Sequence, residues 1–120
     1  MDNVKKTILS FRHALRGLRV AAKESSFKIM IGFALFAVWL TFRLPLDRWE
    51  QIVIYFLIGS VLSTEIINSQ IERVLDLIQP NYDLRVKNIK DLSAGAVLVI
   101  SITALLIGIL IFIPYIIVSF

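Results

Sequence analysis

The chain has 120 residues, enough for one domain, and 58% of them are hydrophobic while only 18% are charged. Soluble domains contain about 45–50% apolar and about 25% charged residues, so these values, with a mean hydropathy of +0.80, exclude a water-soluble protein and predict a membrane protein. The absence of cysteine excludes disulfides and thiolate zinc sites, and a net charge of +4 in so apolar a chain favours anionic lipid over nucleic acid as a partner.

The amino-terminal segment has the pattern of an amphipathic helix over residues 4–24. Its apolar residues recur at helical spacing, at Val4, Ile8, Phe11, Leu15, Leu18 and Ala22. Lysine and arginine residues flank this stripe, as in helices that lie flat among lipid headgroups. A helix packed on another protein surface is the alternative. We expect no signal peptide, because the first long apolar stretch begins only near residue 29, behind this basic segment.

Two membrane-spanning helices follow. Residues 29–42 are uncharged, and flanking apolar residues with Lys28 and Arg43 at the ends extend the first span to about residues 27–45. Pro45 stops this helix. A second uncharged run, residues 51–64, continues in helical pattern to Pro80 and predicts one helix over residues 50–78 that crosses the bilayer and then enters water.

The third span is the clearest, since residues 92–120 contain no charge. We predict a single all-α integral membrane domain over residues 1–120, with a loop over residues 79–91 and a third span over residues 92–118. Lysine and arginine number seven through Lys28 and four between Arg73 and Lys90, against two in the first loop. The positive-inside rule then places the amino terminus and the 79–91 loop in the cytoplasm and the carboxy terminus outside.

Four polar residues of the second helix share one face, because Glu65, Asn68, Glu72 and Asp76 are separated by 3, 4 and 4 residues. Glu65 follows the apolar run, and we expect it near the hydrocarbon boundary, where ionisable groups are costly and usually functional. The alternative for Glu65 is a carboxyl group hydrogen-bonded between helices. For Asp76 the alternative is a solvated helix end.

Acidic residues near the cytoplasmic boundary are suited to a magnesium nucleotide, because Mg²⁺ commonly takes one or two carboxylates together with the phosphates. Glu24 and Glu72 are the candidates at that depth. Lys90 and Asp91, just before the third span, offer a cation for phosphate and a further acid. The glycine positions do not form a G-x-x-x-x-G-K-[ST] sequence, so any nucleotide must be held without a Walker loop.

The string from Glu65 to Asp76, E-x-x-N-S-x-I-E-x-x-x-D, resembles the signature of the prokaryotic diacylglycerol kinase family, which includes undecaprenol kinases of similar size. Further matches flank it in the same order. They are F-x-x-A-x-x-G-L-R at residues 11–19, E-x-x-F-K at residues 24–28 and K-D-x-x-A-G-A-V-L at residues 90–98. The similarity covers residues 6 to about 100.

This resemblance implies a homotrimer of three-span subunits with an amino-terminal surface helix and active sites shared between neighbours. It implies an ATP-dependent lipid kinase of the bacterial plasma membrane in which Glu65 is the general base beside Asn68. It further implies Mg²⁺ held by Glu24 and Glu72, and lipid contacts at Glu65 and Ala94.

The resemblance also implies a set of nucleotide-binding positions: Lys6, His13, Glu24, Glu72, Asn81, Tyr82, Asp83, Lys90 and Asp91. Two residues depart from the family pattern. Asp83 stands where the family usually has histidine at the end of its nucleotide-binding loop, and Gln70 stands where it usually has alanine.

Two other classes of function remain open at the level of sequence. A small proton-coupled transporter would use an intramembrane glutamate such as Glu65, but it gives no task to Glu24, Glu72 or the Lys90-Asp91 pair. A non-catalytic membrane adaptor would use only the basic helix. Within the kinase interpretation, nothing in the sequence chooses between diacylglycerol and undecaprenol as the substrate.

Overall fold

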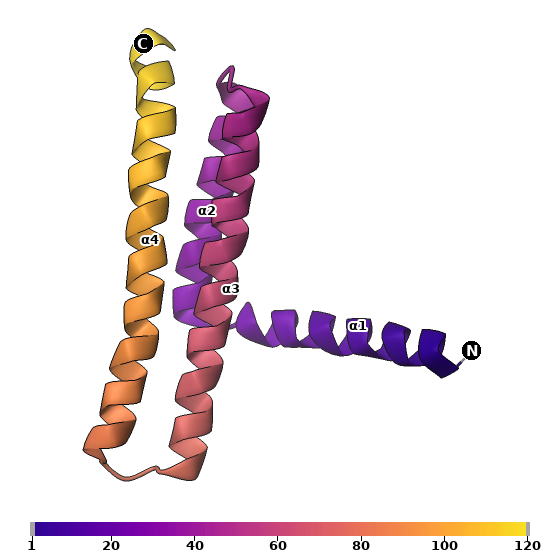
Figure 1. The fold of residues 1–120 in the computed structure, drawn as a ribbon. Coiled ribbons are helices and arrows are strands. Elements are labelled where there is room, and N and C mark those ends of the chain that lie inside the picture. Colours follow the sequence, from indigo (N-terminus) through magenta and orange to yellow (C-terminus); the bar gives the residue numbers. More distant parts are fainter. Residues whose placement is uncertain (1, 120) are drawn as a thin grey trace.

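The computed structural model describes residues 2–119, and within them all regular structure is helical. The four helices are α1 (Asp2–Ala21), α2 (Ser25–Arg43), α3 (Arg48–Ile78) and α4 (Leu84–Ser119). Helices α2, α3 and α4 run side by side as a bundle, whereas α1 leaves the bundle crosswise from the start of α2 (Figure 1). The chain is an all-α protein, as the sequence predicts.

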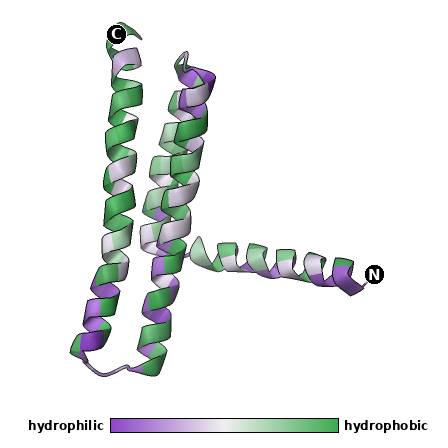
Figure 2. Cartoon of the chain, in the orientation of Figure 1, coloured by the Kyte–Doolittle hydropathy of each residue, from purple (hydrophilic) through white to green (hydrophobic). Residues whose placement is uncertain are grey.

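Each helix of the bundle is long and apolar enough to cross a membrane: Ser25–Arg43, Arg48–Ile78 and Leu84–Val118. Figure 2 shows that the apolar parts of α3 and α4 lie above the level of α1, and that hydrophilic residues concentrate in the lower parts of both helices, near their connection. We call the end with this connection, residues 79–83, the polar end of the bundle, and the opposite end the far end. The chain therefore has three candidate spans, and its polar end is formed by α3 and α4, which extend beyond the start of α2 (Figure 1).

The connection between α2 and α3 follows from local sequence. Leu44, which precedes Pro45, is extended, with φ −105° and ψ 147°, because a residue before proline avoids helical angles. The first span thus ends at Arg43 rather than at residue 45. Helix α3 begins two residues earlier than predicted because Asp47 and Glu50 form a reciprocal capping box, in which the Glu50 carboxylate accepts from the Asp47 N–H at 2.9 Å.

The connection between α3 and α4 is shorter than the predicted loop over residues 79–91. Helix α4 begins at Leu84, so residues 84–91 are helical and only residues 79–83 are irregular. The charged residues before residue 92 limit the apolar run but do not interrupt the helix. A prediction from hydropathy therefore places the start of α4 too late in the chain. The helix also continues through Pro114, as spanning helices tolerate where neighbours satisfy the backbone.

The far end of the bundle holds the main buried apolar cluster, formed by Leu46, Ile54 and Phe112. Beside it, the Tyr115 hydroxyl of α4 donates a hydrogen bond to the Glu50 carboxylate of α3. Most other large apolar side chains of the spans are exposed on the single chain, as expected for helices that face lipid or further protein. The fold thus ties α3 to both neighbours at the far end, and places the polar groups of α3 near the other.

Candidate active site

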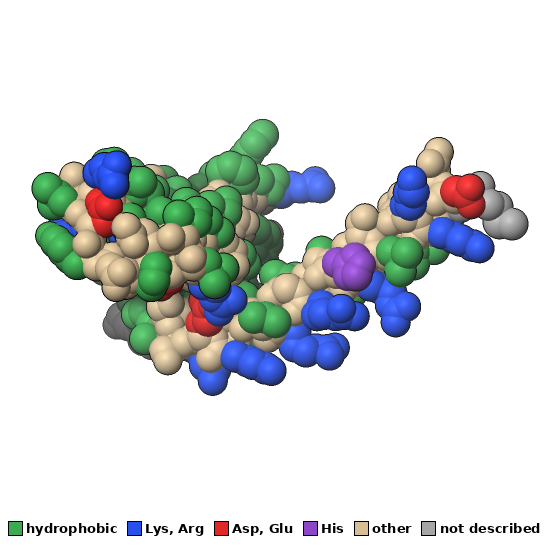
Figure 3. All heavy atoms as spheres, turned by 90° about the horizontal axis from the view of Figure 1, so that it is seen from below, with side chains coloured by type: hydrophobic (Ala, Val, Ile, Leu, Met, Phe, Trp, Pro, Cys, Tyr) green, Lys and Arg blue, Asp and Glu red, His purple; other side chains and the backbone are tan. Residues whose placement is uncertain are grey.

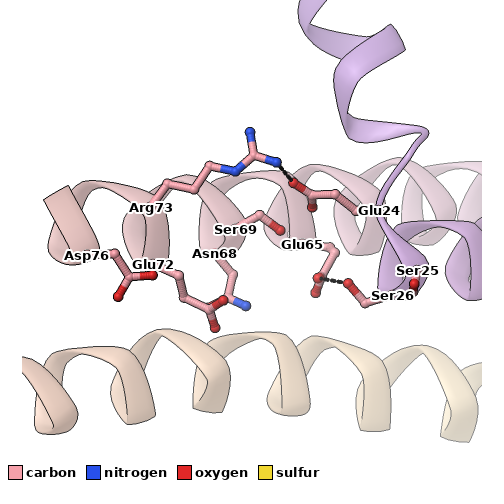
Figure 4. Close-up of a pocket in the computed structure, with 9 residues that line it drawn as sticks. All are labelled: Glu24, Ser25, Ser26, Glu65, Asn68, Ser69, Glu72, Arg73 and Asp76. Atoms are coloured by element: carbon pink, nitrogen blue, oxygen red, sulfur yellow. Dashed lines mark hydrogen bonds and ion pairs between the residues drawn. The ribbon is translucent and has the colours of Figure 1, made fainter. Parts of the chain in front are cut away.

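An open cleft of about 560 Å³ lies between the start of α2 and the polar half of α3. The nine lining residues are Glu24, Ser25, Ser26, Glu65, Asn68, Ser69, Glu72, Arg73 and Asp76 (Figure 4). All carry polar side chains. The cleft contains most of the acidic groups that the sequence singles out, and it brings residues of two separate motifs together.

The α3 side of the cleft is the face formed by Glu65, Asn68, Glu72 and Asp76. In Figure 4 these side chains leave α3 on the side that faces α4. Their exposure increases toward the polar end: Glu65 is 5% exposed and Asn68 9%, whereas Glu72 and Asp76 are exposed. One helix face therefore presents a buried carboxylate and, two turns away, a solvated one.

Two serines contact the buried members of this face. The Ser26 hydroxyl of α2 donates a 2.8 Å hydrogen bond to Oε1 of Glu65. The Ser93 hydroxyl of α4 donates a 2.6 Å hydrogen bond to Oδ1 of Asn68. Buried polar groups need such partners, because leaving one unsatisfied is costly. Each neighbouring helix thus holds one polar residue of α3.

Ion pairs surround the cleft. Glu24, which precedes α2, pairs with Arg73 of α3, on the side of α3 away from Glu72 (Figure 4). Lys90 of α4 reaches across to Asp76, with a separation of 2.5 Å between Nζ and Oδ1. Asp91, in contrast, pairs with Lys87 on its own helix at 2.8 Å. Lys90 therefore belongs to the border of the cleft in this chain, while Asp91 does not reach it.

The predicted nucleotide loop, Asn81 to Asp83, lies at the polar end beyond the cleft. The Asp83 carboxylate accepts hydrogen bonds from the Arg85 side chain, at 2.9 Å from Nη2, and from the Arg85 backbone N–H, at 2.8 Å. These bonds lower the pKa of Asp83 from 3.8 to about 2. The Asp83 carboxylate is thus ionised at neutral pH and locally neutralised by Arg85, and Tyr82 beside it is 82% exposed.

Three further predicted contacts stand outside the cleft. Lys6 and His13 lie on the exposed part of α1, which extends away from the bundle (Figure 1), and Ala94 is exposed on α4. None of them lines the cleft. Within one chain, Glu24, Glu65, Asn68 and Glu72 line one cleft, with Glu24 and Glu72 on opposite sides of α3, and most of the predicted nucleotide contacts lie outside it.

The donor chemistry of the cleft fits a magnesium nucleotide. Glu24 and Glu72 supply hard carboxylate oxygens, and Mg²⁺ bound with phosphates usually needs only one or two of these. Among the residues that the structure describes, no group of three acidic or histidine side chains could hold a metal ion by itself. The two carboxylates are thus of the chemical type that a nucleotide-bound Mg²⁺ uses.

Sequence reasoning did not single out Ser25, Ser26 or Arg73, which line the cleft, or Ser93, which bonds to Asn68 from α4. Ser26 and Ser93 lie 39 and 25 residues from their partners Glu65 and Asn68, so no local spacing connects them. Arg73 sits next to Glu72, and from the sequence it enters only the count of basic residues around the second loop. Its charge beside an acidic motif was the one signal available, but its partner Glu24 is 49 residues away.

Comparison with known proteins gives the family. The family described as prokaryotic diacylglycerol kinase matches residues 12–112. The undecaprenol kinase of Bacillus subtilis (strain 168) is 37% identical over 114 residues, which cover 94% of this chain and 93% of that protein. The family match includes the first two spans, most of the third and every residue of the cleft, so the chain belongs to the prokaryotic diacylglycerol kinase family of ATP-dependent membrane lipid kinases.

Proposed function

We propose that this protein transfers the γ-phosphate of ATP to the hydroxyl of a lipid alcohol, diacylglycerol or undecaprenol, with Glu65 as general base. The observation that carries this proposal is the position of Glu65. Its carboxylate is buried, lies on a face of α3 that becomes solvated two turns further on, and lines an open cleft. A lipid hydroxyl at the headgroup level and a nucleotide from the water side can meet in such a place.

The proposed reaction is a direct phosphoryl transfer. Glu65 takes the proton of the lipid hydroxyl as its oxygen attacks the γ-phosphorus, the bond from that phosphorus to the bridging oxygen of ADP breaks, and Glu65 later releases the proton to water. Asn68, one turn from Glu65, has an amide that can orient the hydroxyl or a phosphate oxygen. Such reactions depend mainly on positioning and charge neutralisation.

We propose Glu24 and Glu72 as the residues that hold Mg²⁺ with the nucleotide. When bound, the ion neutralises charge on the phosphate oxygens. Glu24 is paired with Arg73 on the side of α3 away from Glu72, so the two carboxylates share one ion only when Glu24 turns away from Arg73. Lys90, at the border of the cleft through Asp76, is the nearest proposed phosphate contact on α4.

The remaining proposed nucleotide contacts, Lys6, His13, the Asn81 to Asp83 loop and Asp91, do not reach the cleft of their own chain. We therefore propose a homotrimer in which neighbouring subunits share each site and in which Ala94 contributes to the lipid pocket. Support comes from a shallow groove of about 490 Å³ on the apolar part of α3. Its lining includes Gly59, Ser60, Ser63 and Thr64, and small residues let spanning helices approach closely.

We propose that α1 lies in the cytoplasmic headgroup layer, with the amino terminus inside a bacterial plasma membrane and the carboxy terminus outside. Figure 3, viewed from the polar end, shows Lys and Arg side chains gathered along α1. Six of the thirteen basic residues lie between Lys5 and Lys23. Basic residues on the cytoplasmic side of spans are the general pattern, and anionic headgroups attract them.

The alternative, a proton-coupled transporter built around Glu65, leaves the pairs Glu24 with Arg73 and Asp76 with Lys90 without a role. Incubating purified protein with γ-labelled ATP, Mg²⁺ and either diacylglycerol or undecaprenol tests the proposal. We expect Mg²⁺-dependent labelling of at least one lipid, and the better substrate identifies the class. Absence of label on every lipid alcohol, together with proton movement in vesicles, would favour the transporter.

A further inference from the structure

The two serine contacts of the cleft suggest a role beyond packing. Ser26 and Ser93 come from different helices, α2 and α4, and each donates its hydroxyl to one of the two most buried polar side chains of the α3 face. These acceptors are the residues that the proposed mechanism places nearest the lipid hydroxyl. We propose that Ser26 and Ser93 are positioning residues that hold Glu65 and Asn68 in the orientation required for phosphoryl transfer.

The contact to Glu65 fixes one carboxylate oxygen and leaves the other for chemistry. Ser26 occupies Oε1 at 2.8 Å. Within the part of the chain that the structure describes, Oε2 has no hydrogen-bond partner from the protein. A carboxylate held at one oxygen cannot rotate freely, so the direction of Oε2 is fixed as well, on a residue that lines the cleft. General base catalysis requires such alignment with the hydroxyl whose proton is removed.

The contact to Asn68 determines which end of its amide faces the substrates. Because Ser93 donates to Oδ1 at 2.6 Å, the amide oxygen is turned toward α4, and the NH₂ group is left to donate elsewhere. A donor is the polarity that suits a phosphate oxygen or the oxygen of an attacking hydroxyl. Ser93 thus sets the polarity of the site at Asn68 without touching a substrate itself.

The position of Ser26 supports a functional rather than a structural role. Ser26 lies in the first turn of α2 and is exposed, so its hydroxyl contributes little to packing. It is also two residues from Glu24, the proposed metal ligand. The segment at the start of α2 therefore carries both the carboxylate of Glu24, proposed to bind Mg²⁺, and the hydroxyl of Ser26, proposed to orient the base. One short segment thus contributes to metal binding and to proton transfer.

The inference rests on the proposed role of Glu65, and the experiment separates the two. Turnover at saturating lipid and the KM for Mg²⁺-ATP are measured for Ser26→Ala, Ser26→Thr, Ser93→Ala, Ser93→Thr and Glu65→Gln. Ser101→Ala, on α4 and eight residues beyond Ser93, serves as the matched control. Thermal unfolding of each variant checks that the fold is intact.

We expect Ser26→Ala to lower kcat by about 10- to 100-fold, because hydrogen bonds to charged groups are the stronger kind and misplaced groups react slowly. Ser93→Ala, which loses a bond between neutral groups, should lower kcat by about 2- to 10-fold. In both cases the KM for Mg²⁺-ATP should stay near the wild-type value. The threonine variants keep the hydroxyl and should recover most of the turnover, and Ser101→Ala should match wild type.

A double variant completes the test. Ser26→Ala should cost nothing further in the Glu65→Gln background, because the group that Ser26 positions is then already absent. If Glu65→Gln is inactive but Ser26→Ala and Ser93→Ala turn over like wild type, the positioning role is wrong and the proposed base stands. If threonine fails to rescue, or KM rises as much as kcat falls, the serines act only structurally. If Glu65→Gln itself remains active, the proposed function fails and this inference fails with it.

Discussion

Glu65 and Glu72 lie seven residues apart on the same face of α3 and line the same cleft, yet Glu65 is only 5% exposed while Glu72 is exposed to solvent. Seven residues of helix correspond to about 10 Å. Two carboxylates in such different surroundings are suited to different tasks. The buried one suits proton transfer with a lipid, and the solvated one suits a magnesium nucleotide that arrives from water.

The metal positions make the first prediction. Glu24→Gln and Glu72→Gln each keep the side-chain size but remove one of two charged oxygen ligands. We expect the Mg²⁺ concentration that gives half-maximal turnover to rise by at least about 10- to 100-fold. Loss of a residue that only supports a metal ligand already lowers metal affinity by this factor. Glu50→Gln, which removes a carboxylate at the far end of the bundle, is the control and should leave this concentration unchanged. An unaltered Mg²⁺ requirement in both cleft variants would remove them from the metal site.

The fold was largely predictable because spans depend on local composition. The length and hydropathy of each run gave three helices, and Pro45 and Pro80 gave two of their ends. Errors arose at boundaries set by hydrogen bonds, such as the Asp47–Glu50 capping box, and at Leu84, where a charged segment continues as helix. Boundaries of this kind depend on capping geometry, which hydropathy does not measure.

The candidate site was predictable only where it is local. The spacing of Glu65, Asn68, Glu72 and Asp76 along one helix is sufficient to put them on one face. The contacts of Ser26 and Ser93 depend on how α2 and α4 pack against α3, so no periodicity in the sequence contains them. The pairing of Glu24 with Arg73, 49 residues apart, is tertiary for the same reason.

Shared sites give the second prediction. The Asp91 carboxylate pairs with Lys87 on its own helix, so within our account only the cleft of a neighbouring chain can use Asp91. Chains carrying Glu65→Gln and chains carrying Asp91→Asn should each be inactive. Mixing the unfolded chains and refolding them together should restore about a quarter of wild-type turnover, since random assembly gives about one site in four with both residues intact. Full inactivity of the mixture, with trimers present, would show that each site lies within one chain.

The third prediction concerns the nucleotide loop. Arg85 lowers the pKa of Asp83 to about 2, so Asp83 stays ionised at every pH used for turnover. The stabilisation from this pair is fully present above pH 3.8 and is lost as the pH falls through about 2. In the proposed site, Arg85→Ala leaves an uncompensated negative charge near the nucleotide phosphates. We expect the KM for ATP to rise by up to about fivefold, the range of exposed ion pairs.

A paired variant isolates the charge. Adding Asp83→Asn to Arg85→Ala removes the unpaired carboxylate and should return the KM for ATP to near the wild-type value. The effect of Arg85→Ala should also shrink at high salt, because exposed charges are screened. A KM that stays high in the double variant would mean that Arg85 contacts the nucleotide directly.

The separation of roles along α3 is tested most directly by calorimetric Mg²⁺-ATP affinity and turnover measured on the same trimeric preparation of Glu65→Gln. The account predicts nucleotide affinity close to wild type, because a buried base need not touch the nucleotide, and turnover reduced by about 10²- to 10⁴-fold, the usual contribution of general acid–base catalysis. Retention of most turnover, or loss of nucleotide affinity as severe as in Glu72→Gln, would contradict it.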